Sequence, residues 1–69
     1  MTDRQFVRCK YPTARLEYRL TGAAGFWKDW YEIKIDTGEI VGRGKIREEA
    51  WKSAKDNIKV KYPTFKAVI

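Results

Sequence analysis

The chain has 69 residues, a net charge of +6 and a hydrophobic content of 43%, with one cysteine and no histidine. This length suffices for a single small domain over residues 1–69. One cysteine excludes an internal disulfide, and without histidine neither a zinc site of the usual ligands nor histidine-based catalysis can form. We therefore expect a protein that is not an enzyme and that holds no metal or cofactor.

The apolar runs are only a few residues long, whereas a membrane-spanning helix needs roughly 20 apolar residues. The start of the chain also lacks the apolar segment of a signal peptide. We expect a soluble, cytoplasmic protein with no membrane partner and no small-molecule substrate.

Two strands are predicted in the first part of the chain. Residues 5–11 alternate loosely between two sides, which predicts a strand with Cys9 as a buried thiol. Residues 15–20 alternate strictly and predict a second, half-buried strand. The core side of this second strand carries Leu16, Tyr18 and Leu20.

The tetrapeptide Lys-Tyr-Pro-Thr occurs twice, at residues 10–13 and 61–64. The first copy follows a predicted strand and the second a predicted helix, and their flanking residues differ. We interpret both copies as the ends of elements and not as a duplicated unit, because proline has no amide hydrogen with which to continue an element. The alternative is that both tyrosines line one binding surface.

The middle of the chain is predicted to form a loop and then a hairpin. Gly22 and Gly25 predict a loop over residues 21–30, since glycine permits backbone angles that other residues avoid. Residues 30–35 alternate as a strand. A turn with positive φ at Gly38 then leads into a returning strand. The core side of the first hairpin strand carries Tyr31, Ile33 and Ile35.

From residue 46 to about residue 59 the apolar period becomes that of a helix. Its apolar stripe consists of Ile46, Ala50, Trp51, Ala54 and Ile58, and the opposite face carries Lys52, Lys55 and Lys59. No side chain at the expected start can cap the helix, and Pro63 requires it to end by residue 60 or 61. The predicted fold class is α+β, a small antiparallel sheet of three or four strands packed on one C-terminal helix.

The segment from Gly42 to Ala50 begins with the pattern G-x-G, and the predicted helix that follows contains alanines. It resembles the end of a double-stranded-RNA-binding domain, in which a G-x-G-x-S-K-K-x-A pattern opens the last helix. The resemblance implies a similar joint between sheet and helix. The chain departs from the family where that family binds RNA: Ile46 replaces a serine, and Glu48 and Trp51 each replace a lysine. No helix is predicted before the first strand.

A second set of features consists of Trp30 in a strand, the turn around Gly38, Gly42, and the helix start at Glu48-Glu49-Ala50 with Ala54 one turn later. These features resemble AP2-type domains and the amino-terminal arm-binding domains of phage integrases. In those families the solvent face of a three-stranded sheet enters the DNA major groove, a placement that a β-sheet fits physically. The resemblance implies that the sheet of this chain contacts DNA in the same way.

If the helix covers one face of the sheet, the other face is basic. We predict a nucleic-acid-binding surface there, because cations interleaved with an aromatic side chain suit phosphates and bases. Its residues are Arg8, Lys10, Arg15, Arg19, Trp30 and Lys34. The alternative is an ordinary solvated face on which Glu17 and Glu32 pair with these cations across strands.

The second candidate surface is aromatic and consists of Phe26, Trp27 and Trp30. In a small domain some of these rings are expected to close the end of the core. An exposed tryptophan would instead be a base-stacking platform or an anchor for a protein partner.

The net charge and the basic sheet face together favour a small, non-enzymatic module that binds DNA or RNA. Two alternatives involve an acidic protein partner. One is a phage-type inhibitor of a host or defence protein, and the other is a small accessory subunit of a larger complex.

Overall fold

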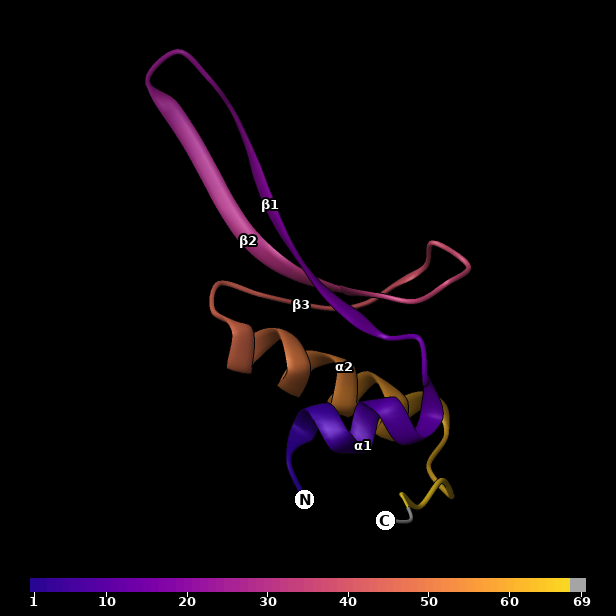
Figure 1. Cartoon of the computed structure of the whole chain (residues 1–69). Coiled ribbons are helices and arrows are strands. Elements are labelled where there is room, and N and C mark those ends of the chain that lie inside the picture. Colours follow the sequence, from indigo (N-terminus) through magenta and orange to yellow (C-terminus); the bar gives the residue numbers. More distant parts are fainter. Residues whose placement is uncertain (68–69) are drawn as a thin grey trace.

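The computed structural model describes residues 1–67 as two helices and a three-stranded antiparallel sheet (Figure 1). The elements in chain order are α1 (Asp3–Lys10), β1 (Arg15–Ala23), β2 (Phe26–Lys34), β3 (Ile40–Gly44) and α2 (Arg47–Lys61). The strand order in the sheet is β1-β2-β3, and α2 packs on one face. The predicted α+β class with a C-terminal helix is confirmed, and α1 is an additional helix.

Helix α1 replaces the strand that was predicted over residues 5–11. The Thr2 hydroxyl accepts a hydrogen bond from the Gln5 amide at 3.1 Å, and Oε1 of Gln5 accepts one from the Thr2 amide at 2.9 Å. This reciprocal capping box satisfies two amides that a helix start otherwise leaves unpaired, and it outweighs a loose alternation. Cys9, predicted to be buried, is exposed on α1.

The predicted loop over residues 21–30 is also wrong. The pairing of β1 with β2 runs without a break from Arg15↔Lys34 to Ala23↔Phe26, so only Ala24 and Gly25 form the turn. Gly25 has φ +85°, a conformation that glycine adopts without strain. We call residues 20–29 the arm, because this part of the hairpin projects beyond β3 and α2 (Figure 1). The molecule is accordingly elongated, with extents of 46, 21 and 19 Å.

The hairpin of β2 and β3 has its turn where predicted, with φ +87° at Gly38. The Ile35 amide donates to the Glu39 carbonyl at 3.1 Å and closes this turn. Strand β3 is shorter than β2 and ends at Gly44, which lies opposite Tyr31. Residues 26–30 of β2 therefore have no β3 partner.

The core lies between the sheet and α2, with a contribution from α1. Its buried side chains are Val7, Ala14, Ile33, Ile35, Val41, Ala50, Trp51, Ala54 and Ile58. The predicted stripe of α2 is confirmed except for Ile46, which is the exposed N-cap residue and forms no side-chain cap. Gly42 allows the close approach of α2, because a Cβ at this position would lie 2.6 Å from the Ala54 amide nitrogen.

The prediction of which side chains of β1 face the core is confirmed only at the start of the strand. Leu16 packs against the core, whereas Tyr18 and Leu20 are exposed by 53% and 57%. Both residues extend towards or into the arm, beyond the region where α2 buries side chains of the sheet.

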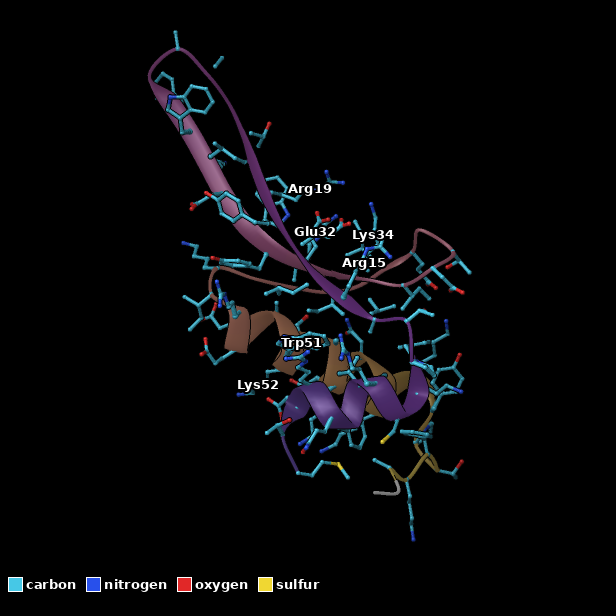
Figure 2. All side chains as sticks on the ribbon, viewed as in Figure 1. Arg15, Arg19, Glu32, Lys34, Trp51 and Lys52 are labelled. Atoms are coloured by element: carbon cyan, nitrogen blue, oxygen red, sulfur yellow. The ribbon has the colours of Figure 1, made fainter. Side chains whose placement is uncertain are left out.

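Helix α1 packs alongside α2, and the contacts between them advance in the same direction along both helices. Near the start of α1, Nζ of Lys55 lies 3.3 Å from Oδ1 of Asp3. One turn later, Nζ of Lys59 lies 5.9 Å from the centre of the Phe6 ring. The face of α2 that was predicted to be solvated is therefore partly covered, while Lys52 stays exposed (Figure 2).

The two Lys-Tyr-Pro-Thr segments end α1 and α2 with the same geometry. The Tyr11 amide donates to the Val7 carbonyl at 2.8 Å, and the Tyr62 amide donates to the Ile58 carbonyl at 2.7 Å. Their interpretation as element ends fits this geometry, but the first copy follows a helix and not the predicted strand. Burial and a hydrogen bond with Tyr62 raise the pKa of Tyr11, so the two tyrosines meet.

Candidate nucleic-acid interface

The face of the sheet that points away from both helices is open, and we call it the open sheet face. Arg15, Arg19, Glu32 and Lys34 gather on it, while Trp51 lies on the helix side (Figure 2). On neighbouring strands, Arg43 lies opposite Glu32 and Trp30 lies opposite Arg19. Residues directly opposite each other share a face of the sheet, so Arg43 and Trp30 also lie on the open sheet face.

Glu32 lies at the centre of the open sheet face and is only 3% exposed. Its Oε1 accepts a hydrogen bond from Nε1 of Trp30 at 2.8 Å, and its Oε2 accepts one from Nε of Arg19 at 3.2 Å. Nε of Arg43 lies 3.9 Å from Oε1. The Trp30 hydrogen bond lowers the pKa of Glu32, and despite the opposing effect of desolvation, the Arg19 and Arg43 guanidiniums lower it further.

Glu17 forms a second cluster beside the first. Nε of Arg15 donates to its Oε1 at 3.2 Å, and Nζ of Lys34 lies 3.5 Å from its Oε2 across the strands. Desolvation acts to raise the pKa of Glu17, but the Arg15 hydrogen bond and the Lys34 charge outweigh it, so the pKa is lowered. The ion pairs predicted for an ordinary solvated face are therefore present.

The carboxylates nevertheless leave most of the arginine donors available. The side chains of Arg15, Arg19 and Arg43 are 51%, 49% and 64% exposed. Arg15 and Arg19 use Nε for their hydrogen bonds, and within residues 1–67 none of the three makes a hydrogen bond through an Nη atom. With Lys34, these cations exceed Glu17 and Glu32 by two positive charges.

Two of the predicted surface residues are not on this face. Arg8 and Lys10 belong to α1, on the helix side of the sheet. Nε of Arg8 donates to the Ala14 carbonyl at 3.2 Å, and Nζ of Lys10 lies 4.0 Å from the centre of the Tyr62 ring. Their predicted placement is wrong because it assumed a strand over residues 5–11.

Arg43 lies on the open sheet face and was missed by the sequence analysis. The signal was available, because the hairpin turn at Gly38 brings the returning strand back along β2 and the alternation of β3 then points Arg43 away from the helix. The glycines on either side of Arg43, Gly42 and Gly44, hide this alternation because they carry no side chain.

The predicted aromatic cluster is divided between the two faces of the arm. Phe26 and Trp27, at the end of the arm, are 82% and 67% exposed, so neither closes the core. Trp30 is half-buried and is held by Glu32 on the open sheet face. On the opposite face of the arm, the Tyr18 hydroxyl donates to Oδ2 of Asp29 at 3.1 Å, which raises the pKa of Tyr18.

No protein-family model matches the chain, and comparisons with curated proteins and with solved structures gave no significant match. Within residues 1–67, no three acidic, histidine or cysteine side chains lie close enough together to hold a metal ion. The helices of this described part are too short or too polar to cross a membrane.

Proposed function

We propose that this protein is a non-enzymatic module that binds nucleic acid through the open sheet face. The observation that carries the proposal is the arrangement of Arg15, Arg19 and Arg43. Arg15 and Arg19 each donate an Nε hydrogen bond to a carboxylate, and Nε of Arg43 lies 3.9 Å from Oε1 of Glu32, while much of each side chain is exposed to solvent.

This arrangement suits phosphate because it fixes the guanidiniums before a ligand arrives. Arginine presents planar, paired N–H donors that match the oxygens of a phosphate, and an anchored side chain loses less conformational freedom on binding. Glu17 and Glu32 reduce the charge of the face but orient its donors. The net charge of +6 adds a long-range attraction for a polyanion.

The two resemblances bear differently on the ligand, since only the one to AP2-type domains and integrase arm-binding domains implies contact through the sheet. Helix α1 supplies the helix before the first strand that the resemblance to double-stranded-RNA-binding domains lacked. The departures at Ile46 and Glu48 remain, and Trp51, in place of a lysine, belongs to the core. The resemblance to AP2-type domains and integrase arm-binding domains implies that DNA is contacted by the solvent face of the sheet, which in this chain is the open sheet face. Both duplex DNA and duplex RNA therefore belong in the test.

The experiment is a fluorescence anisotropy titration of labelled duplex DNA, duplex RNA and single strands over a series of salt concentrations. We expect binding at low salt that weakens steeply as salt rises, because bound phosphates release counterions. The double variant Arg15→Ala/Arg19→Ala should bind about tenfold more weakly, and its salt slope should fall by about two. No binding at low salt would reject the proposal.

The matched control is Lys52→Ala/Lys66→Ala, which removes the same charge from exposed positions away from the open sheet face. This variant should keep the salt slope of the parent protein. An equal loss of affinity in both double variants would mean that diffuse charge, and not the open sheet face, attracts the ligand. Circular dichroism must first show that each variant is folded.

A second candidate function, binding of an acidic protein, is favoured by the exposure of Phe26 and Trp27. An exposed tryptophan at a protruding tip is a suitable anchor, whose truncation in an interface costs about 2 kcal/mol or more. A phage-type inhibitor and an accessory subunit both fit this description. If this function is the main one, Trp27→Ala should abolish partner binding while Arg15→Ala/Arg19→Ala mainly slows association.

A further inference from the structure

The central strand of the sheet becomes an edge strand in the arm. Strand β2 pairs with β1 along its whole length, but β3 pairs with it only as far as Tyr31. From Phe26 to Trp30, the side of β2 that faces away from β1 has no neighbouring strand within residues 1–67. Unpaired backbone groups at such an edge are a template for another strand.

The direction of these backbone groups follows from the register. Ile35 donates its amide towards the β3 side, to the Glu39 carbonyl. The register shift between Ile33 and Lys34 adds its extra residue on β3, where Val41 lies between the partners Gly42 and Ile40, so the alternation along β2 continues. Because successive residues of an antiparallel strand point their backbone groups to alternate sides, Trp27 and Asp29 also point theirs to the β3 side. In the arm no strand from the described residues pairs with that side. The amides and carbonyls of Trp27 and Asp29 are therefore available to a further strand, which would continue the line of β3.

Two clefts lie along this edge. One cleft of about 490 Å³ is lined by Trp27, Lys28, Asp29, Trp30 and Lys45. A second, of about 480 Å³, is lined by Trp30, Lys45, Arg43, Gly44 and Glu49. The two clefts share Trp30 and Lys45, so they lie next to each other between the arm and the end of β3, and we call them together the groove.

The charges in the groove favour an acidic occupant. The lining carries the cations Lys28, Arg43 and Lys45 and the carboxylates of Asp29 and Glu49. The carboxylates keep their negative charge, because their hydrogen-bond donors, the Tyr18 hydroxyl and the Lys45 amide at 3.1 Å, are neutral. The ammonium groups of Lys28 and Lys45 form no ion pair or hydrogen bond with any residue in the described part of the chain. A strand in the groove therefore meets three cations against two carboxylates, and Lys28 and Lys45 have no ion-pair partner among the described residues.

The two faces of the arm dictate which side chains the added strand carries. Lys28 and Trp30 point to the open sheet face, so side chains of the added strand on that side lie next to a cation. Trp27, which is 67% exposed, and Asp29 point to the other face, so side chains on that side lie next to an apolar ring and a carboxylate, which disfavours acidic residues there. Acidic residues suit the first row and apolar residues suit the second.

A second copy of this chain fits the edge poorly. Two identical antiparallel strands must pair about a two-fold axis, and the register that overlaps all of residues 26–30 sets Lys28 of one copy against Lys28 of the other. Like charges directly opposite each other are destabilising. A different chain does not have this restriction.

We propose that the open edge of β2, from Phe26 to Trp30, accepts an extended strand of a partner protein in which acidic and apolar side chains alternate. Backbone hydrogen bonds to Trp27 and Asp29 hold the strand, and its acidic row meets Lys28. This mode of recognition, addition of a strand to a sheet edge, obtains affinity from the backbone and specificity from alternate side chains.

The test uses the ¹⁵N-labelled protein and a short blocked peptide in which glutamate and valine alternate. We expect the amide signals of Trp27 and Asp29 to move during the titration. A peptide in which lysine and valine alternate should bind more weakly, because it meets Lys28 and Lys45 with like charge. The variant Asp29→Pro should bind the glutamate peptide about tenfold more weakly than Asp29→Ala, since both lose the carboxylate but only proline loses the outward amide.

Several results would overturn the proposal. One is the absence of any shift with either peptide, and another is stronger binding of the lysine peptide. Shifts confined to Tyr18 and Leu20 would place the strand on the outer edge of β1, and this readout does not depend on whether Asp29→Pro folds. Self-association in light scattering that Asp29→Pro abolishes, without peptide binding, would show that the occupant is a second copy. None of these measurements depends on the nucleic-acid function.

Discussion

Nε1 of Trp30 donates a hydrogen bond to Oε1 of Glu32 over 2.8 Å, and this bond holds a buried carboxylate in the middle of a basic surface. Glu32 is only 3% exposed, so its negative charge is stabilised by the side chains around it and not by water. The indole thus positions the carboxylate, and the carboxylate positions Arg19 and Arg43. Removal of any member of this group should affect the others.

The first prediction concerns stability at acid pH. The pKa values of Glu17 and Glu32 lie below the ordinary value of 4.5 in the folded protein, so the unfolded state binds protons more readily. Their contribution to stability is fully present above pH 4.5 and is lost as the pH falls through the lowered pKa values. Urea denaturation at a series of pH values should show this loss.

The second prediction isolates Glu32. Glu32→Gln keeps an acceptor for Trp30 but loses the charge that pairs with Arg19, so we expect a loss of about 1–2 kcal/mol at neutral pH. The acid-dependent loss of stability should also become shallower. Asp56→Asn, an exposed change on α2, is the control and should alter stability by less than about 0.5 kcal/mol. Identical pH profiles of Glu32→Gln and the parent would contradict this account.

The third prediction tests the packing of α2 on the sheet. Ala54 is fully buried, so Ala54→Asp places an unpaired carboxylate in the core and should cost about 3 kcal/mol or more, or prevent folding. Lys52→Asp should be tolerated, since Lys52 is exposed. Lys55 is not a suitable control, because its ammonium pairs with Asp3 of α1. Thermal melts that are equal for Ala54→Asp and Lys52→Asp would show that α2 packs through another face.

The fourth prediction separates the tryptophans. Trp51 is 9% exposed and part of the core, so Trp51→Ala should cost about 3–5 kcal/mol, enough to unfold a small domain. Trp27, on the arm, should be replaceable by alanine with a change of less than about 0.5 kcal/mol. Denaturation followed by circular dichroism measures both. A large loss in Trp27→Ala would mean that the arm packs against the body of the molecule.

The fifth prediction concerns Gly42, where β3 meets α2. A Cβ there would lie 2.7 Å from the Cβ of Ala54 and also close to its amide, so Gly42→Ala should cost about 1–3 kcal/mol by overpacking. Gly25→Ala is a useful comparison. Its Cβ would meet open space, and only the positive φ should cost about 1 kcal/mol. A smaller loss at Gly42 than at Gly25 would contradict the close approach.

The sequence predicts those helices and strands in which the spacing of apolar residues agrees with the glycines and prolines at their ends. Helix α2 has a sustained apolar period and ends before Pro63, and the second hairpin has Gly38 where a positive φ is needed. Helix α1 is only eight residues long, too short for its apolar period to be told from a loose alternation, and its capping box was the clearer signal. The arm was mistaken for a loop because a strand without a core to cover need not alternate.

The candidate site was also predicted only in part from the sequence. Arg15, Arg19 and Lys34 were predicted correctly as neighbours because strict alternation fixes which face of a strand a side chain occupies. Glu32 was predicted to pair with cations, but its burial depends on Trp30 and on a cross-strand register that a single sequence does not contain. The open edge of β2 depends on the difference in length between β2 and β3, which is equally a property of the assembled sheet.

The arm also influences where the folded protein unfolds locally. Its backbone hydrogen bonds link only β1 and β2, with no buried side chain among residues 20–29 to protect them, whereas the same two strands cover Ile33 near their other end. Amide protons should therefore exchange with deuterated solvent in a gradient along one hairpin, fastest at the turn and slowest at the core. The tip can fray and re-form while the body stays folded. A ligand that binds the tip therefore suppresses this local fraying more than it suppresses unfolding of the whole domain.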